Sequence, residues 1–228
     1  MTRAEPASRL GAVFVAVLGV LLAIAAIRTG SVQVASRDAR DALVAVASER
    51  EVPGVVAARA SLEGALARAP EDAELLELHG RWALRDAAQA ADAAAARAAN
   101  EVAARDFRAA LAQRPRWPYA WAGLATALSG VDGDATAIAQ AVGNASRYGR
   151  NERRVNAELA ELWLSHRDSL PPLERAWDRV LASEPQQWID RADRAGRGLT
   201  ACSRPALPPA AFDRCVALGW LTATTPQG

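Results

Sequence analysis

Residues 103–115, AARDFRAALAQRP, decide the fold. Ala103, Phe107 and Ala110 stand twelve, eight and five positions before the final proline. On a helix these offsets form one stripe, with small residues where a neighbouring helix approaches and a large residue that fills the gap. Two further prolines have the same register before them: Ala58, Leu62 and Ala65 precede Pro70, and Leu173, Trp177 and Val180 precede Pro185. A leucine also stands four positions before each proline, at Leu66, Leu111 and Leu181. The recurrence predicts one repeated type of helix.

The stripe resembles the second helix of a tetratricopeptide repeat, whose pattern is A-x3-F-x2-A-x4-P. The first helix of that repeat should follow each proline. After Pro115 the W-x2-L-G-x2-Y places are taken by Trp121, Leu124, Ala125 and Leu128. After Pro70 the match is poorer, because Leu76 and Gly80 fit but His79 replaces a leucine. The resemblance implies an all-α protein with a tetratricopeptide-like helical-hairpin solenoid over residues 55–197.

The spacing of the prolines is irregular. Pro70 and Pro115 are 45 residues apart, whereas Pro115 and Pro185 are 70 apart, which is two units of 35. The excess in the first interval is about three helical turns, so we expect one longer helix through the Ala-rich run 87–104. In the second interval Gly149 should end a helix without a proline. The next helix is predicted over 151–165.

The composition agrees with a folded helical protein. The chain has 228 residues, of which 51% are hydrophobic and 23% charged, and alanine, the best helix former, is abundant while aromatic residues are few. The sequence contains no lysine, so its 27 basic residues are arginines, balanced by 26 acidic residues and spread without a basic block. We therefore expect no nucleic-acid partner.

Residues 10–27 form an uncharged, mainly apolar stretch between Arg9 and Arg28. As a helix it is about 27 Å long, enough for the hydrocarbon core of a membrane. A signal peptide is the alternative, but its apolar region is usually shorter and the nearest cleavage-like sequence, Val34-Ala35-Ser36, lies well beyond this stretch. We predict an uncleaved transmembrane anchor, with a cytoplasmic tail over 1–9 and a connecting helix over 28–54. The flanking arginines do not decide its orientation.

Cys202 and Cys215 lie in a Pro-rich segment over 198–228 that also holds a predicted capping helix, 210–218, and a tail. They have no metal-ligand spacing and no neighbouring histidine. If the domain is exported, we expect them to form a disulfide worth about 3 kcal/mol in the chain-entropy model. Two free thiols are the alternative. The pair and the short tail favour a cytoplasmic N-terminus, with the repeat domain on the far side of the membrane.

Residues that suggest catalysis or metal binding are isolated. His79 and His166 have no ligand-spaced neighbours, and Ser165, His166 and Asp168 are too close along the chain to form a triad. The Asp132-Gly133-Asp134 turn lacks the remaining acidic positions of a calcium loop, so Asp134 is predicted to cap a helix beginning at Ala135. We expect no enzyme activity, cofactor or metal. The seven tryptophans are expected to fill the core, with a binding groove as the alternative.

The repeat resemblance implies that partners bind along the first helices. The positions that line the groove of a tetratricopeptide repeat correspond in this sequence to Glu74, Glu77, Arg81, Tyr119, Thr126, Arg153 and Asn156. Arg81 or Arg153 would donate charged hydrogen bonds to a carboxylate, and Tyr119 would supply a flat contact surface. The alternative is the solvated side of amphipathic helices. If the groove exists, replacing Arg81, Tyr119 and Arg153 together with alanine should leave stability nearly unchanged while abolishing capture of the partner.

A single span, degenerate repeats and residues 148–155, YGRNERRV, leading into Leu162-Trp163, resemble membrane-anchored tetratricopeptide proteins of bacterial exopolysaccharide or O-antigen machinery. The nearest likeness is to the VpsP-type polysaccharide-biosynthesis family. This resemblance implies a non-enzymatic scaffold or adaptor that binds protein partners in a glycan synthesis or ligation complex. It also implies a single-pass protein of the bacterial inner membrane with a periplasmic repeat domain. A periplasmic assembly chaperone that grips client peptides in the repeat groove is the alternative, and the sequence leaves both open.

Overall fold

The computed structural model describes residues 17–23, 26, 30, 33–34, 36–42, 54–131, 133–165, 171–204 and 207–222. The regular structure of these residues is helical throughout, so the predicted all-α class is confirmed. The main helices are α2 (Val55–Arg68), α3 (Ala73–Ala88), α4 (Ala93–Gln113), α5 (Pro118–Ser129), α6 (Ala135–Tyr148), α7 (Arg153–Ser165), α8 (Pro171–Ser183), α9 (Pro185–Arg194), α10 (Gly198–Cys202) and α11 (Pro209–Ala217). The chain divides within α3 into two compact units, residues 1–78 and 79–228.

The first unit contains α2 and the beginning of α3. Helix α2 follows Gly54, whose φ of 103° favours glycine, and buries Leu62 and Ala65 of the predicted stripe. The first turn of α3 is capped by Asp72, whose carboxylate accepts hydrogen bonds from the backbone nitrogens of Glu74 and Leu75 at 2.9 and 3.0 Å. This cap fixes where α3 begins.

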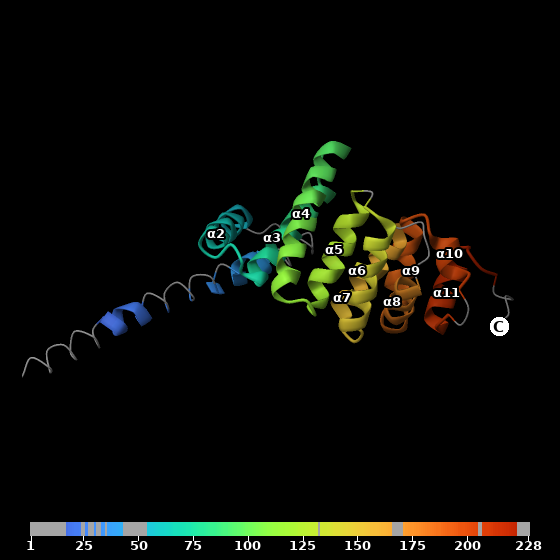
Figure 1. Ribbon diagram of the computed structural model, residues 1–228. Coiled ribbons are helices and arrows are strands. Elements are labelled where there is room, and N and C mark those ends of the chain that lie inside the picture. The colour runs from blue at the N-terminus through green and yellow to red at the C-terminus, as the bar shows by residue number, and fades with distance from the viewer. Residues whose placement is uncertain are drawn as a thin grey trace, which may run out of the picture. The chain divides into compact units, whose positions relative to one another are not determined.

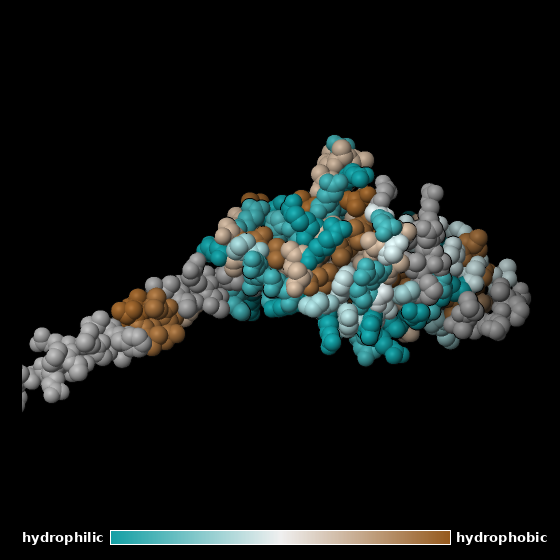
Figure 2. Space-filling model, in the orientation of Figure 1, coloured by the Kyte–Doolittle hydropathy of each residue, from teal (hydrophilic) through white to brown (hydrophobic). Residues whose placement is uncertain are grey.

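The predicted anchor lies mostly outside the described residues. No helix in the described part of the chain is long and apolar enough to cross a membrane. Within the predicted span, residues 17–23 are helical, and their large apolar side chains are 46–62% exposed. They form the brown group between grey atoms near the N-terminal end in Figure 2. Most of the predicted tail and connecting helix, together with Asp132, His166 and Asp168, also lies outside the described residues.

The second unit is a succession of packed helices. From α4 to α11, each helix contacts the next one in the chain, and α5 also contacts α7 while α6 contacts α8. Figure 1 shows these helices following one another in chain order. Contacts are therefore concentrated between near neighbours in the sequence.

The predicted stripe forms the core of this succession. Phe107 of α4 is fully buried and packs against two glycines: a Cβ added at Gly80 of α3 would lie 3.1 Å from its ring, and one at Gly123 of α5 would collide with the ring. Ala103 and Ala110 on the same face are also fully buried. The aromatic ring thus fits between two helices that approach closely because they lack side chains there.

The same arrangement recurs further along the chain. Trp177 of α8 is stacked on Trp163 of α7, with ring centres 4.6 Å apart, and meets Trp188 of α9 edge to face at 5.9 Å. Phe107 and Trp177 are separated by two intervals of 35 residues, and the midpoint, Val142 of α6, is fully buried. A fully buried apolar side chain therefore recurs at 35-residue intervals in α4, α6 and α8. Trp82 is buried as well, so core packing is confirmed for four tryptophans.

The predicted continuous helix through 87–104 is wrong. Helix α3 ends at Ala88 and α4 begins at Ala93, because the Asp92 carboxylate accepts a hydrogen bond from Ala95 N at 2.8 Å and starts a new helix. Helix α4 has 21 residues, so its length takes up the excess in the first repeat. His79, which stands in place of the expected leucine, is half-buried and pairs with Asp106 of α4 at 2.6 Å.

The turn between α6 and α7 is where the proline of the repeat is missing. Gly149 ends α6 as predicted, but its φ of −110° is accessible to other residues. Glycine is required by close packing, because a Cβ would lie 2.8 Å from Pro118 and 2.9 Å from Val155. At the other end of α6, the Asp134 carboxylate caps the helix by accepting from Thr136 N at 3.2 Å, as predicted.

The C-terminal segment is more helical than its prolines suggest. It contains α10 in addition to α11, which corresponds to the predicted helix over 210–218. The structure joins Cys202 to Cys215 in a disulfide with Cα atoms 5.8 Å apart, and α11 also packs against α9. Beyond α11, Trp220 covers Gly198 and donates from Nε1 to Asp193 of α9 at 2.7 Å. These contacts fasten the last helices to α9.

Candidate partner-binding site

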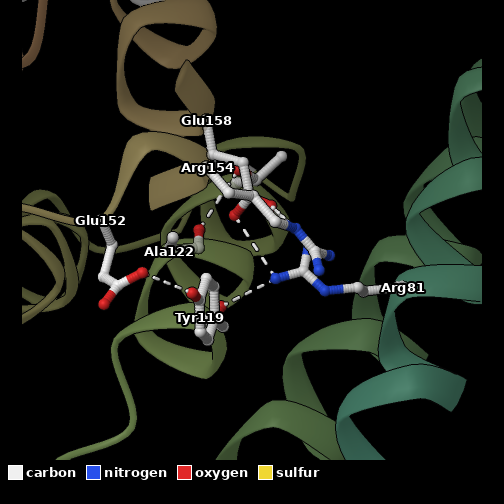
Figure 3. Close-up of polar contacts among 7 residues, drawn as sticks. Arg81, Tyr119, Ala122, Glu152, Arg154 and Glu158 are labelled. Carbon is white, nitrogen blue, oxygen red and sulfur yellow. Dashed lines mark hydrogen bonds and ion pairs between the residues drawn. The ribbon is translucent and has the colours of Figure 1, made fainter. Parts of the chain in front are cut away.

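A polar cluster connects α3, α5 and α7, three of the predicted first helices (Figure 3). The guanidinium of Arg81 forms an ion pair with Glu158 at 2.6 Å and donates a second hydrogen bond to the backbone carbonyl of Tyr119 at 3.2 Å. The Arg81 side chain is only 11% exposed. One arginine of α3 therefore links the beginning of α5 to the middle of α7.

Tyr119 forms the second half of this cluster. Its hydroxyl donates to Glu152 at 2.7 Å, and the guanidinium of Arg154 lies 5.5 Å from its ring centre. Arg154 also donates to Glu158 at 3.3 Å, so the two halves share a carboxylate. The hydrogen bond to Glu152, followed by burial and the charge of Glu152, raises the pKa of the Tyr119 phenol above its ordinary value. Tyr119 therefore remains a neutral donor.

The charges in this first-helix cluster, defined as Arg81, Tyr119, Glu152, Arg154 and Glu158, are balanced. Two guanidinium groups face two carboxylates, and Glu158 accepts from both arginines. The predicted hydrogen bond from Arg81 to a partner carboxylate would have to displace Glu158 from a largely buried ion pair. The cluster thus ties three helices together, and only its outer members, Arg154 and Glu152, are exposed.

Of the other predicted contact residues, two belong to the first unit and three to the second. In the first unit, Glu74 pairs with Arg40, and Glu77 is only 3% exposed. In the second, the Thr126 hydroxyl donates to the carbonyl of Ala122 in its own helix at 3.3 Å. The prediction that Glu77 is accessible to a partner is wrong, because packing buries its side chain. The Thr126 hydroxyl is already hydrogen-bonded within α5.

The last two predicted residues differ from each other. Arg153 is exposed at the beginning of α7 and pairs with Glu184. Asn156, by contrast, is only 6% exposed, and its amide bonds to Arg179 of α8 at 2.9 Å. The prediction that Asn156 lies in an open groove is therefore wrong, because its side chain is buried and faces the neighbouring helix. Of the predicted residues in the second unit, Arg81 and Tyr119 lie in direct contact, through the hydrogen bond from Arg81 to the Tyr119 carbonyl.

Sequence reasoning missed Glu152, Arg154 and Glu158. One signal was available: Arg154 and Glu158 are four residues apart on a predicted helix, a spacing at which opposite charges attract. The pairing of Glu158 with Arg81 has no local signal because the two residues are 77 positions apart.

An open depression of about 600 Å³ lies between α7 and α9. It is lined by Glu161, Leu164, Ser165, Arg191, Arg194 and Ala195. Arg191 forms an ion pair with Glu161 across it. Arg194 is exposed, so the depression offers a cation beside the apolar side chain of Leu164. This surface lies on two predicted first helices, but none of its residues was selected from the sequence.

The described residues contain no group of three histidine, cysteine or acidic side chains that could hold a metal ion. No protein-family model matches the sequence, and neither do any curated proteins or solved structures.

Proposed function

We propose that the protein is a non-enzymatic, membrane-anchored adaptor whose tetratricopeptide-like solenoid binds protein partners. The observation that carries the proposal is the 35-residue recurrence of Phe107, Val142 and Trp177, each buried in a helix that packs against its neighbours in the chain. Helix pairs that contact only their neighbours build an extended array with long open faces, a form that suits binding rather than catalysis.

The membrane anchor in this proposal is supported by the apolar residues 17–23. Their large side chains are exposed on a helical segment that lies within the uncharged stretch 10–27. An exposed apolar helix requires a cover, and a bilayer provides one. The disulfide between Cys202 and Cys215 favours an oxidising compartment such as the periplasm for the repeats.

Two measurements test this topology. N-terminal sequencing of protein from the membrane fraction should find residues 10–27 retained; a mature start near Arg37 would contradict the anchor. Alkylation of the natively isolated protein followed by mass measurement should find no free thiol. Two alkylated cysteines would contradict export to an oxidising compartment.

The depression between α7 and α9 is the partner surface that the proposal favours. It combines the exposed guanidinium of Arg194 with Leu164 and the pair Arg191–Glu161. Leu164 is only 7% exposed, so the surface suits a partner that presents a carboxylate to Arg194. The resemblance of the sequence to proteins of exopolysaccharide machinery supports a partner that belongs to a membrane complex for glycan synthesis or ligation.

Capture of partners from membranes in mild detergent tests the function. The full-length tagged protein should retain one stoichiometric membrane protein, and Arg194→Glu should lose it. Arg108→Glu, which changes an exposed arginine on α4, is the matched control and should retain it. Many clients in less than stoichiometric amounts would instead support the periplasmic chaperone, and equal capture by both variants would exclude this depression.

A further inference from the structure

A second polar cluster lies where the turn between α6 and α7 meets α8. The buried amide of Asn156 donates to the backbone carbonyls of Arg150 and Glu152, both at 3.1 Å, and accepts from the guanidinium of Arg179 at 2.9 Å. Asn156 thereby holds Arg179 next to the backbone of the turn. This arginine is half-buried and fixed in position before any ligand arrives.

Two exposed arginines accompany Arg179. Arg175 stands one turn earlier on α8, and Arg150 lies on the turn that Asn156 holds. Burial, and then the like charges of Arg150 and Arg175, lower the pKa of Arg179 from its ordinary value. Like charges at this helical spacing are unfavourable, so the folded chain keeps three cations together at a cost in stability.

The carboxylates on the surrounding elements are engaged elsewhere. Glu152 accepts from Tyr119, Glu184 pairs with Arg153, and Arg204 binds Asp178 in a two-point contact at 3.0 and 3.1 Å and Glu174 at 3.8 Å. Within the described part of the chain, Arg150, Arg175 and Arg179 form no ion pair, and the only hydrogen-bond acceptor of their guanidinium groups is the neutral amide of Asn156. None of the three guanidinium groups is therefore neutralised by an ion pair within the part of the chain that the structure describes.

We propose that Arg150, Arg175 and Arg179 form a binding site for an anionic phosphate group. Guanidinium groups present paired N–H donors that match the oxygens of a phosphate, and three of them can surround one such group. The phosphate can belong to a small soluble molecule or to a phospholipid headgroup, which share this chemistry.

A calorimetric titration tests the site. The full-length protein in zwitterionic detergent is titrated with pyrophosphate, and the heat of binding is measured. Arg150→Gln/Arg175→Gln should bind about tenfold more weakly or not at all, since each hydrogen bond between charged groups contributes appreciably. Both arginines are exposed, so the variant should fold. The matched control is Arg108→Gln/Arg116→Gln, which removes the same charge from exposed positions elsewhere and should bind like the wild type.

A second arm identifies the source of the phosphate. Phosphatidylglycerol added to the micelles should raise the melting temperature of the wild type and the control, but not of Arg150→Gln/Arg175→Gln, if a headgroup occupies the site. Binding of pyrophosphate without this lipid effect indicates a soluble ligand. The proposal is overturned if neither probe binds, or if both probes act equally on all three proteins.

Discussion

Replacing Arg81 with alanine should lower the free energy of unfolding of the second unit by about 2 kcal/mol. The change removes an ion pair with Glu158 at 2.6 Å and a hydrogen bond to the Tyr119 carbonyl at 3.2 Å. Hydrogen bonds to charged groups contribute about 1.5–3 kcal/mol, but Glu158 is partly exposed and keeps Arg154, so the lower part of that range applies. For a unit of this size the loss corresponds to a fall of about 5 °C in melting temperature.

Tryptophan fluorescence during urea unfolding isolates this effect, because all seven tryptophans belong to the second unit. Arg97→Ala is the control: Arg97 forms an exposed pair with Glu101 on α4, and its loss should cost only about 0.5 kcal/mol or less. A double-mutant cycle of Arg81→Ala with Glu158→Gln should yield a coupling energy of about 1 kcal/mol or more. Equal small effects at Arg81 and Arg97 would refute the reasoning and restore the interpretation of Arg81 as a solvated surface residue.

Two further predictions concern packing and pH. Gly123→Ala places a methyl group against the Phe107 ring and should destabilise the protein by about 1–3 kcal/mol, whereas Gly143→Ala, with open space around its Cβ, should be neutral or stabilising in thermal unfolding; equal effects would contradict the close approach of α4 and α5. The Tyr119 phenol should ionise above its ordinary pKa, so its contribution to stability is complete below the unfolded-state pKa of about 10 and is lost as pH rises through the higher folded-state value. Glu152→Gln should lower the pKa of the Tyr119 phenol. Ultraviolet absorbance measures this pKa, with Tyr119→Phe as the reference that lacks the signal, and an unchanged pKa in Glu152→Gln would contradict the hydrogen bond.

The sequence predicted the features that depend on local periodicity. The stripe around Phe107 could be recognised because helical spacing places its members on one face whatever surrounds it, and the structure buries that face. The cap at Asp134 was likewise a local pattern. Asp92 carried the same capping signal, but the alanines around it favour helix so uniformly that the break was missed.

The candidate site depends on contacts that periodicity does not contain. A charged residue on a first helix can face solvent, a partner or the next helix. Its spacing from other residues along the sequence is the same in each case, so the spacing does not distinguish these positions. Arg81 proved to pair with a residue of α7, and Asn156 with Arg179 of α8. The fold was therefore more predictable than the assignment of individual polar side chains.

The central claim, that the helical array binds a specific protein partner through its first helices, is tested most directly by photo-crosslinking in living cells. A photoreactive amino acid would be incorporated at position 194 in the depression between α7 and α9, and at position 108 on α4 as the control. The adaptor account predicts that position 194 crosslinks to one membrane protein that position 108 does not reach. No crosslinked protein at position 194, or the same mixture of proteins at both positions, would contradict it.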